Sequence, residues 1–190
     1  MKPIYSLLFL YAALWVVTPA YALEKEFDEN NDEIFTQDFN TVIPAYIKDI
    51  RHYYRVNADT ATGGTIQSKD AIKELKSSGF KTVIDLRQAP EGVERERGKV
   101  EQEGLTYVNL PVSGSTALSD ETLIQFNKLI EKVEKPVLIH CASGNRAGAV
   151  WANHLLSKGA TLEEAIEQGQ RIGMQSLFAI ELRETHASPK

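Results

Sequence analysis

The run Pro136-Val137-Leu138-Ile139-His140 constrains the fold of this chain more than any other segment does. Its three consecutive aliphatic residues leave no polar face on a short strand, a pattern typical of a strand covered on both sides in a parallel sheet. Parallel neighbours need crossover connections, which are usually helices. We therefore expect a single α/β domain whose central, mostly parallel sheet is flanked by helices.

The rest of the chain alternates between strand and helix patterns, as that fold requires. Predicted strands cover residues 53–56, 81–86, 107–112 and 136–140. Predicted helices cover residues 68–79, 91–103, 119–133, 146–157 and 161–171. Ser68, Ser119 and Thr161 are the expected N-caps, and Thr161 opens a capping-box pattern. The two glycines within residues 61–64 predict a turn there, and the heavily charged stretch 91–103 is typical of an exposed helix.

The first 22 residues match a secretory signal. Lys2 supplies a positive start, residues 4–17 are uncharged and mostly apolar, and Ala20-Tyr21-Ala22 fits the small-x-small pattern before a cleavage point. The apolar stretch is shorter than the roughly 20 residues of a spanning helix. We expect cleavage after Ala22 and export, into a bacterial periplasm, with no stable membrane insertion afterwards. An uncleaved N-terminal anchor is the alternative.

Four segments follow from these patterns: a signal at 1–22, an acidic lead-in at 23–50, the α/β domain at 51–180 and a C-terminal tail at 181–190. The formal net charge of −5 argues against nucleic acid as a partner, because polyanion binding favours the opposite sign. The single cysteine, Cys141, excludes an intramolecular disulfide and a metal site built from several cysteines. An unpaired thiol in an exported chain forms an intermolecular bridge, is reactive, or is buried and inert.

The strongest candidate site lies where the central strand ends, in the segment His140-Cys141-Ala142-Ser143-Gly144-Asn145-Arg146. Ligands of open α/β sheets bind at the carboxyl ends of the strands. The small residues 142–144 let successive backbone N–H groups converge on an anion at the start of a helix. Arg146 adds a planar fork that binds two oxygens of a phosphate-like group. A thiol in such surroundings ionises more readily than a free one, so Cys141 is the candidate nucleophile.

This segment resembles the signature loop of the cysteine-dependent phosphatases of the dual-specificity and tyrosine type, which reads His-Cys, five residues, Arg. The resemblance extends over residues 53–173. It includes GFKTVIDLR at 79–87 and GLTYVNLPV at 104–112, which are similar to segments of dual-specificity phosphatases. The chain most resembles a bacterial branch, the phosphatase-like domain of beta-lactamase-hydrolase-like proteins, whose loop is likewise one residue short.

The resemblance implies a dual-specificity-phosphatase-like fold and a role for each loop residue. Cys141 would attack phosphorus and form a phosphocysteine, which water then hydrolyses. The side chain of Arg146 and the loop amides would hold the equatorial oxygens. These amides belong to Ala142, Ser143, Gly144, Asn145 and Arg146. His140 would orient the loop. The family uses no metal or other cofactor, and its substrate would be a phosphorylated small molecule or a phosphoprotein.

Three departures from the family pattern bear on turnover. Only four residues separate Cys141 from Arg146, so the loop is tighter. Ala147 stands where the family has Ser or Thr, whose hydroxyl helps the thiolate to leave. The first carboxylate after the strand at 107–112 is Asp120, the candidate general acid, although the first turn of a helix is also a favourable place for any acid. Without a general acid, good leaving groups such as those of aryl phosphates and phosphotyrosine are favoured.

Two other functions are compatible with the same loop. Rhodanese-like sulfurtransferases also carry a cysteine at a strand end, and the Asp85-Leu86-Arg87 segment resembles their early Asp-x-Arg pattern. In that reading Cys141 would carry a persulfide. Residues 159–166 read as a capped helix, however, and not as the short strand and paired glycines of that family. The third reading is a phosphate-binding module with weak or no catalysis, which the missing acid and missing hydroxyl would explain.

Overall fold

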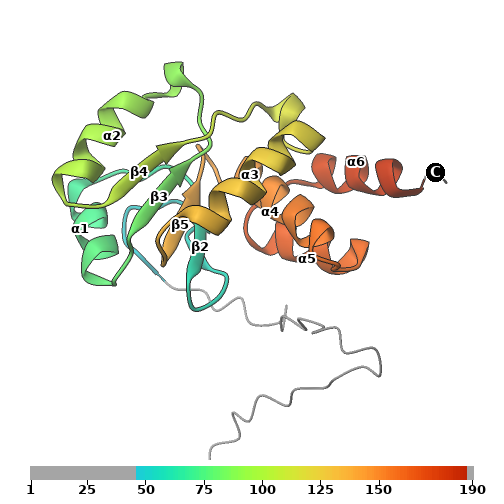
Figure 1. Ribbon diagram of the computed structural model, residues 1–190, viewed down its shortest axis with the longest axis horizontal. Coiled ribbons are helices and arrows are strands. Elements are labelled where there is room, and N and C mark those ends of the chain that lie inside the picture. The colour runs from blue at the N-terminus through green and yellow to red at the C-terminus, as the bar shows by residue number, and fades with distance from the viewer. Residues whose placement is uncertain (1–45, 188–190) are drawn as a thin grey trace, which may run out of the picture. The chain divides into compact units, whose positions relative to one another are not determined.

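The computed structural model of the chain describes residues 46–187, so the predicted signal at 1–22 and residues 23–45 of the lead-in lie outside the described part. Within that part, five strands form a sheet in the order β1-β2-β5-β3-β4 (Figure 1). The strands are β1 (Tyr54–Arg55), β2 (Thr60–Gly63), β3 (Thr82–Asp85), β4 (Thr106–Asn109) and β5 (Val137–His140). β1 runs antiparallel to β2 and the other pairs are parallel. The predicted mostly parallel sheet is confirmed.

Helices connect the strands and follow the sheet at the C-terminal end of the chain. They are α1 (Lys69–Ser77), α2 (Val93–Gln102), α3 (Asp120–Lys132), α4 (Asn145–Ser157), α5 (Leu162–Arg171) and α6 (Ser176–Ala187), with the 3-10 turns η1 (Ala89–Glu91) and η2 (Gly114–Thr116). The side chains of Ser68, Ser119 and Thr161 each accept a hydrogen bond from a first-turn backbone N–H of α1, α3 and α5. The three predicted N-caps are therefore confirmed.

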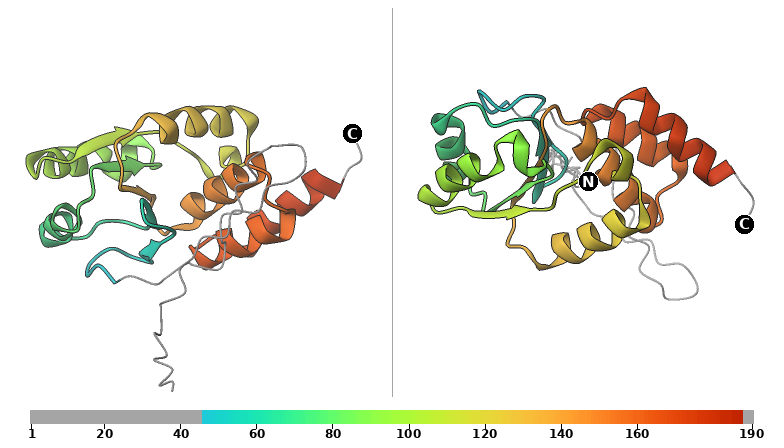
Figure 2. Two further views of the ribbon diagram at one scale, coloured as in Figure 1. Left: turned by 60° about the horizontal axis from the view of Figure 1, so that its bottom comes forward. Right: turned by 90° about the horizontal axis from the view of Figure 1, so that it is seen from above.

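The helices cover the two faces of the sheet in separate groups (Figures 1 and 2). α1 and α2 bury their apolar side chains with Val83 of β3 and Leu138 of β5. α3, α4, α5 and α6 bury theirs with Ile84 and Ile139. Neighbouring strand residues thus face opposite layers, because side chains alternate along a strand. Every residue of β5 is buried, as expected of the central strand.

Two segments differ from their predicted form. Residues 61–64 were expected to form a turn, but Thr60–Gly63 is the buried strand β2, whose residues pair in register with those of β5. Small residues suit this position because a Cβ at Gly63 would lie only 3.0 Å from Ile50. The stretch predicted as an exposed helix is η1 followed by α2, and the side chain of Glu96 on α2 is buried.

The folded unit extends past both expected boundaries of the α/β domain. Ile47 and Ile50 belong to the expected lead-in, yet both are buried, and Ile50 forms a β-bridge with Ile66. α6 has no predicted counterpart; it crosses the expected boundary at residue 180 and buries Leu182. Within residues 46–187, no helix combines the length and the apolar character needed to cross a bilayer.

Candidate active site

The cysteine loop, residues 141–146, connects the end of β5 to the start of α4. Its first N–H, that of Cys141, donates to the carbonyl of Gly63 (3.2 Å) and so continues the pairing of β5 with β2. Gly144 turns the chain with a φ of 92°, a left-handed conformation that glycine adopts without strain. The N–H of Gly144 then points back to Cys141 and donates to its Sγ at 3.2 Å. The loop therefore closes over the sulfur, which lies at its base and belongs to a residue that is 1% exposed.

Arg146 lies in the first turn of α4, and its guanidinium is held on one side. Nη1 donates to Oε2 of Glu91 (2.9 Å) and to the carbonyl of Val112 (2.9 Å), and Nη2 donates to Oε1 of Glu91 (2.5 Å). These bonds use three of the five guanidinium N–H groups. The other two, on Nε and Nη2, share an edge that matches two oxygens of a phosphate.

Arg146 and Glu91 shift each other's pKa values. The hydrogen bond to Glu91 raises the pKa of Arg146 against the opposing effect of burial, and the electrostatic interactions with Cys141 and Glu91 raise it further. The hydrogen bond from Arg146 in turn holds the pKa of Glu91 below its ordinary value. Both side chains are therefore ionised at neutral pH, and a guanidinium is fixed beside the cysteine.

Other segments hold the loop from outside. Thr65, just after β2, donates to the carbonyl of Ala142 with its N–H (3.1 Å) and its hydroxyl (2.9 Å). Nδ1 of His52 lies 2.8 Å from the carbonyl oxygen of Ser143. The amide of Asn145 exchanges hydrogen bonds with Gln175, whose backbone N–H donates to Asn145 Oδ1 at 2.7 Å. The carbonyls of Ala142 and Ser143 are thus engaged on the outside of the loop.

A buried ionic cluster, made of Asp85, Arg87, Glu96, Tyr107 and His140, lies behind the loop. Arg87 donates to Asp85 Oδ2 (2.8 Å) and to Glu96 Oε1 (2.6 Å), and the hydroxyl of Tyr107 donates to Asp85. Nε2 of His140 lies 3.0 Å from Glu96 Oε1, and its Nδ1 lies 3.3 Å from the carbonyl of Cys141. The residue expected to orient the loop therefore connects it to this cluster.

Hydrogen bonds within the cluster shift the pKa values of Asp85 and Tyr107. Burial would raise the pKa of Asp85, but hydrogen bonds from Arg87 and Tyr107 outweigh it and hold that pKa below its ordinary value. The pKa of Tyr107 is raised, first by burial and then by its bond to Asp85. Ligand atoms of Asp85, Glu96 and His140 lie within 4.8 Å of one another, a grouping of types that can hold a cation. The guanidinium of Arg87 already bonds both carboxylates, and we assign no metal here.

The remaining predicted residues, Asp120 and Ala147, form no side-chain bond with the loop. Asp120 is the exposed first residue of α3, and its side chain makes no hydrogen bond or ion pair with any described residue. Ala147 is fully buried in α4, in the position expected to carry a hydroxyl. Sequence reasoning missed Glu91, Thr65 and His52. The ion pair of Glu91 joins residues 55 positions apart, so no local pattern could signal it.

A cysteine and an arginine on one strand–loop–helix turn of a mostly parallel sheet are typical of the cysteine-dependent phosphatases. We assign the protein to this class. Residues 36–185 match the family model described as PTP-NADK, the DSP-PTPase phosphatase fused to NAD+ kinase, and the chain belongs to this family. The resemblance drawn from the loop is confirmed.

Individual relatives agree with this assignment. The beta-lactamase hydrolase-like protein of Xylella fastidiosa strain Temecula1 is 30% identical over 117 residues, which make up 59% of this chain and 27% of that protein. The chain thus spans about a quarter of the length of this curated relative. A crystal structure from Neisseria meningitidis superposes with a TM-score of 0.60 at 22% identity, covering 72% of this chain and 96% of that one. A cysteine-to-serine form of TpbA from P. aeruginosa, in complex with pTyr, gives a TM-score of 0.53 at 18% identity, covering 78% and 96%.

Proposed function

We propose that this protein hydrolyses phosphomonoesters, with aryl phosphates and phosphotyrosine as the favoured class, through a phosphocysteine on Cys141. One observation carries the proposal: the N–H of Gly144 donates to the sulfur of Cys141 at 3.2 Å while Arg146 is held beside it with two N–H groups on one edge. Donors already aimed at the place where an anion binds are what phosphoryl transfer chiefly requires of a protein.

The reaction has two displacements. In the first, the sulfur attacks phosphorus, the S–P bond forms, the P–O bond to the leaving group breaks, and the alcohol departs with a proton from solvent. In the second, water attacks the phosphocysteine, the S–P bond breaks, and inorganic phosphate leaves while the thiolate is restored. Arg146 and the loop amides hold the three equatorial oxygens in both steps.

The leaving group sets the preferred substrate. Among the described residues, Glu91 is the only one whose carboxylate bonds a residue of the loop. Glu91 is paired with Arg146. Departure of an alkoxide needs a proton donor, whereas a phenolate departs more easily without one. The crystal structure of TpbA with pTyr supports the same choice.

Assays of the purified protein with p-nitrophenyl phosphate and phosphotyrosine test this proposal. We expect hydrolysis by the wild type, none by Cys141→Ser, and a loss of about 100-fold or more in Arg146→Ala, as for other preorganised donors. Lys128→Ala, which removes an exposed charge on α3, is the control and keeps full activity. A stable phosphoprotein adduct trapped from the wild type and absent from Cys141→Ser would show the covalent intermediate.

The same preparation tests the two other readings. Thiocyanate formation from thiosulfate and cyanide, dependent on Cys141, with no phosphate release, would replace the phosphatase with a sulfurtransferase. Binding of vanadate or phosphate without turnover of any aryl phosphate would leave a phosphate-binding module.

Export belongs to the proposal because residues 1–22 match a signal. Expression of the full chain in a Gram-negative host, followed by fractionation and N-terminal sequencing, tests it. We expect periplasmic protein that begins at Leu23. A chain that retains Met1 and sediments with membranes would instead indicate an uncleaved anchor.

A further inference from the structure

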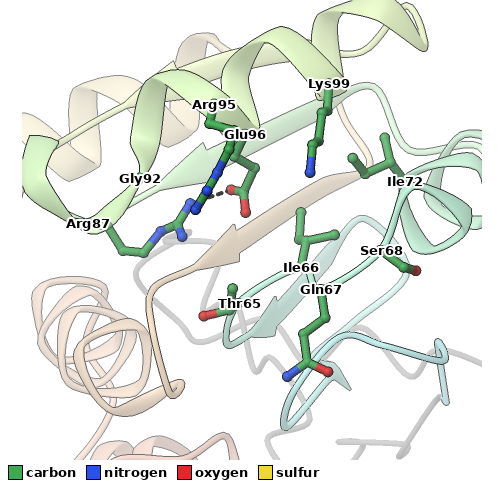
Figure 3. A pocket seen from close by; sticks show the side chains of 10 residues that line it. All are labelled: Thr65, Ile66, Gln67, Ser68, Ile72, Arg87, Gly92, Arg95, Glu96 and Lys99. Carbon is green, nitrogen blue, oxygen red and sulfur yellow. Dashed lines mark hydrogen bonds and ion pairs between the residues drawn. The ribbon is translucent and has the colours of Figure 1, made fainter.

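A cavity of about 350 Å³ lies between α2 and the segment that joins β2 to α1 (Figure 3). One wall comes from α2 and the end of β3, with the cationic side chains of Arg87, Arg95 and Lys99. The opposite wall is the segment between β2 and α1, with Thr65, Gln67 and Ser68. Ile66 and Ile72 give it an apolar side. This size is in the range of cavities that hold small molecules and not of surfaces that bind folded partners.

The cavity is positively charged although the chain as a whole is acidic. Arg87 is neutralised by Asp85 and Glu96, and Glu96 is the one carboxylate that lines the cavity. The side chains of Arg95 and Lys99, both on exposed positions of α2, form no ion pair or hydrogen bond with any residue in the range 46–187. Figure 3 shows both side chains extending from α2 towards the cavity. Two cations without counter-ions, one of them a guanidinium, favour an anion at this place.

Two residues join the cavity to the proposed active site. Thr65 lines the cavity and also donates twice to the carbonyl of Ala142 in the loop. Gly92 lines it on the other side and directly follows Glu91, which holds Arg146. The guanidinium of Arg95 lies against Gly92, since a Cβ there would stand 3.3 Å from Arg95 Nη2. The cavity and the cysteine loop are therefore neighbours through Thr65, and each has its own cationic side chains.

We propose that this cavity binds a second phosphate group of the substrate whose first phosphate is transferred to Cys141, so that small-molecule bisphosphates are the preferred substrates. This inference rests on the proposed phosphatase activity. Arg95 and Lys99 contact the second phosphate and take no part in the chemistry at the first. They set specificity, and their contribution appears only with substrates that carry the second group.

The test compares phenyl phosphate with two aryl bisphosphates of different spacing, 1,4-benzene bisphosphate and 4,4′-biphenyl bisphosphate. We expect kcat/KM of the wild type to be at least about tenfold higher for one of the bisphosphates, the gain from one or two charge-assisted hydrogen bonds. The double variant Arg95→Ala/Lys99→Ala loses this advantage and keeps its kcat/KM for phenyl phosphate. Lys128→Ala retains both values.

Three results would overturn the inference: no preference for either bisphosphate, a preference that survives in the double variant, or an equal advantage for a phosphotyrosine peptide with acidic flanks. A wild type that fails to hydrolyse phenyl phosphate contradicts the phosphatase proposal instead. In that case calorimetric binding of the bisphosphates to the wild type and to the double variant still decides the role of the cavity. Binding lost in the double variant supports that role, and equal binding refutes it.

Discussion

The carboxylate of Glu91 accepts hydrogen bonds from both terminal nitrogens of Arg146, at 2.9 and 2.5 Å. Glu91 is itself fixed, because its Oε2 also accepts from the N–H of Gln88 (2.8 Å) and its carbonyl accepts from Arg87 Nη1 (3.3 Å). η1 thus connects the buried ionic cluster to the arginine of the loop. The guanidinium is oriented by a neighbouring segment and not by the loop alone.

Glu91→Gln tests the importance of this orientation. The amide cannot accept at both of its atoms, so Arg146 loses one bond and part of its fixed direction. We expect kcat/KM for p-nitrophenyl phosphate to fall about tenfold or more, since small misplacements of a positioning group are costly. Steady-state kinetics at saturating and limiting substrate measure the change.

Glu94→Gln is the control for this variant, because it removes the same charge from an exposed site on α2 that contacts Arg97. Its kcat/KM should equal that of the wild type. If Glu91→Gln were as active as the wild type, or more active, Glu91 would be a competitor of phosphate for Arg146 and not its support.

Gly144→Ala tests the closure of the loop. The residue has a φ of 92°, and a Cβ would lie 3.3 Å from the carbonyl oxygen of Ile172. We expect a loss of roughly 1–2 kcal/mol in stability from the left-handed conformation and a fall of about 100-fold in kcat/KM as the N–H leaves the sulfur. Gly79→Ala shares the conformation, with a φ of 90°, but meets nothing within 4 Å. It should lose stability alone; an equal fall in its activity would contradict this account.

Glu96→Gln tests the buried ionic cluster. Glu96 accepts from Arg87 and lies 3.0 Å from His140, and its side chain is 8% exposed. The substitution removes the charge-assisted bond from Arg87 to Glu96 while Arg87 stays paired with Asp85, so we expect about 2 kcal/mol of destabilisation in urea unfolding, as for the loss of one hydrogen bond to a charged group. Glu94→Gln, whose pair with Arg97 is exposed, should change stability by less than about 1 kcal/mol. Similar losses in both variants would mean that the cluster contributes little.

His154 on α4 should make stability depend on pH. Burial, and then the charges of Lys158 and Lys135, lower its pKa to about 4 from 6.5. Between these two values the unfolded chain binds a proton that the folded chain does not, so stability is lost as the pH falls through this window. The difference corresponds to about 3 kcal/mol between pH 7 and pH 4.

Chemical unfolding of the wild type and His154→Gln at several pH values checks this expectation. The variant should lose about 3 kcal/mol less than the wild type over the same interval, because other groups titrate equally in both. His186→Gln, on α6, serves as a matched loss of a histidine. Parallel pH profiles for the wild type and His154→Gln would refute the assignment to His154.

The elements that the sequence predicted well are those with a local physical signal. β5 is a run of aliphatic residues, and α1, α3 and α5 begin at side chains that cap them. β2 was missed because Ala61 and Gly63 do not favour strands and the two glycines at 63–64 resemble a turn, although the two threonines do favour a strand; pairing with β5 supplies the stability. α6 was missed because its burial depends on α5, which only the folded chain brings into contact.

The residues of the candidate site also divide into those with a local sequence signal and those without one. Cys141, Gly144 and Arg146 lie within six residues, and their types and spacing predict an anion site without any tertiary information. Glu91, Thr65 and His52 come from distant segments, and an acid in a charged stretch such as 91–103 looks like a solvated side chain. The burial of Glu96 was hidden for the same reason, because its partner Arg87 lies on another element.

The loop is secured by His52 near one end of the described chain and by Gln175 near the other. During synthesis, the ribosome must therefore release nearly the whole domain before these two contacts can exist together. A truncated product that stops before Gln175 contains Cys141 but lacks the hydrogen bonds between Gln175 and Asn145 of the loop. A nascent fragment would therefore carry a cysteine loop that is held by His52 but not by Gln175.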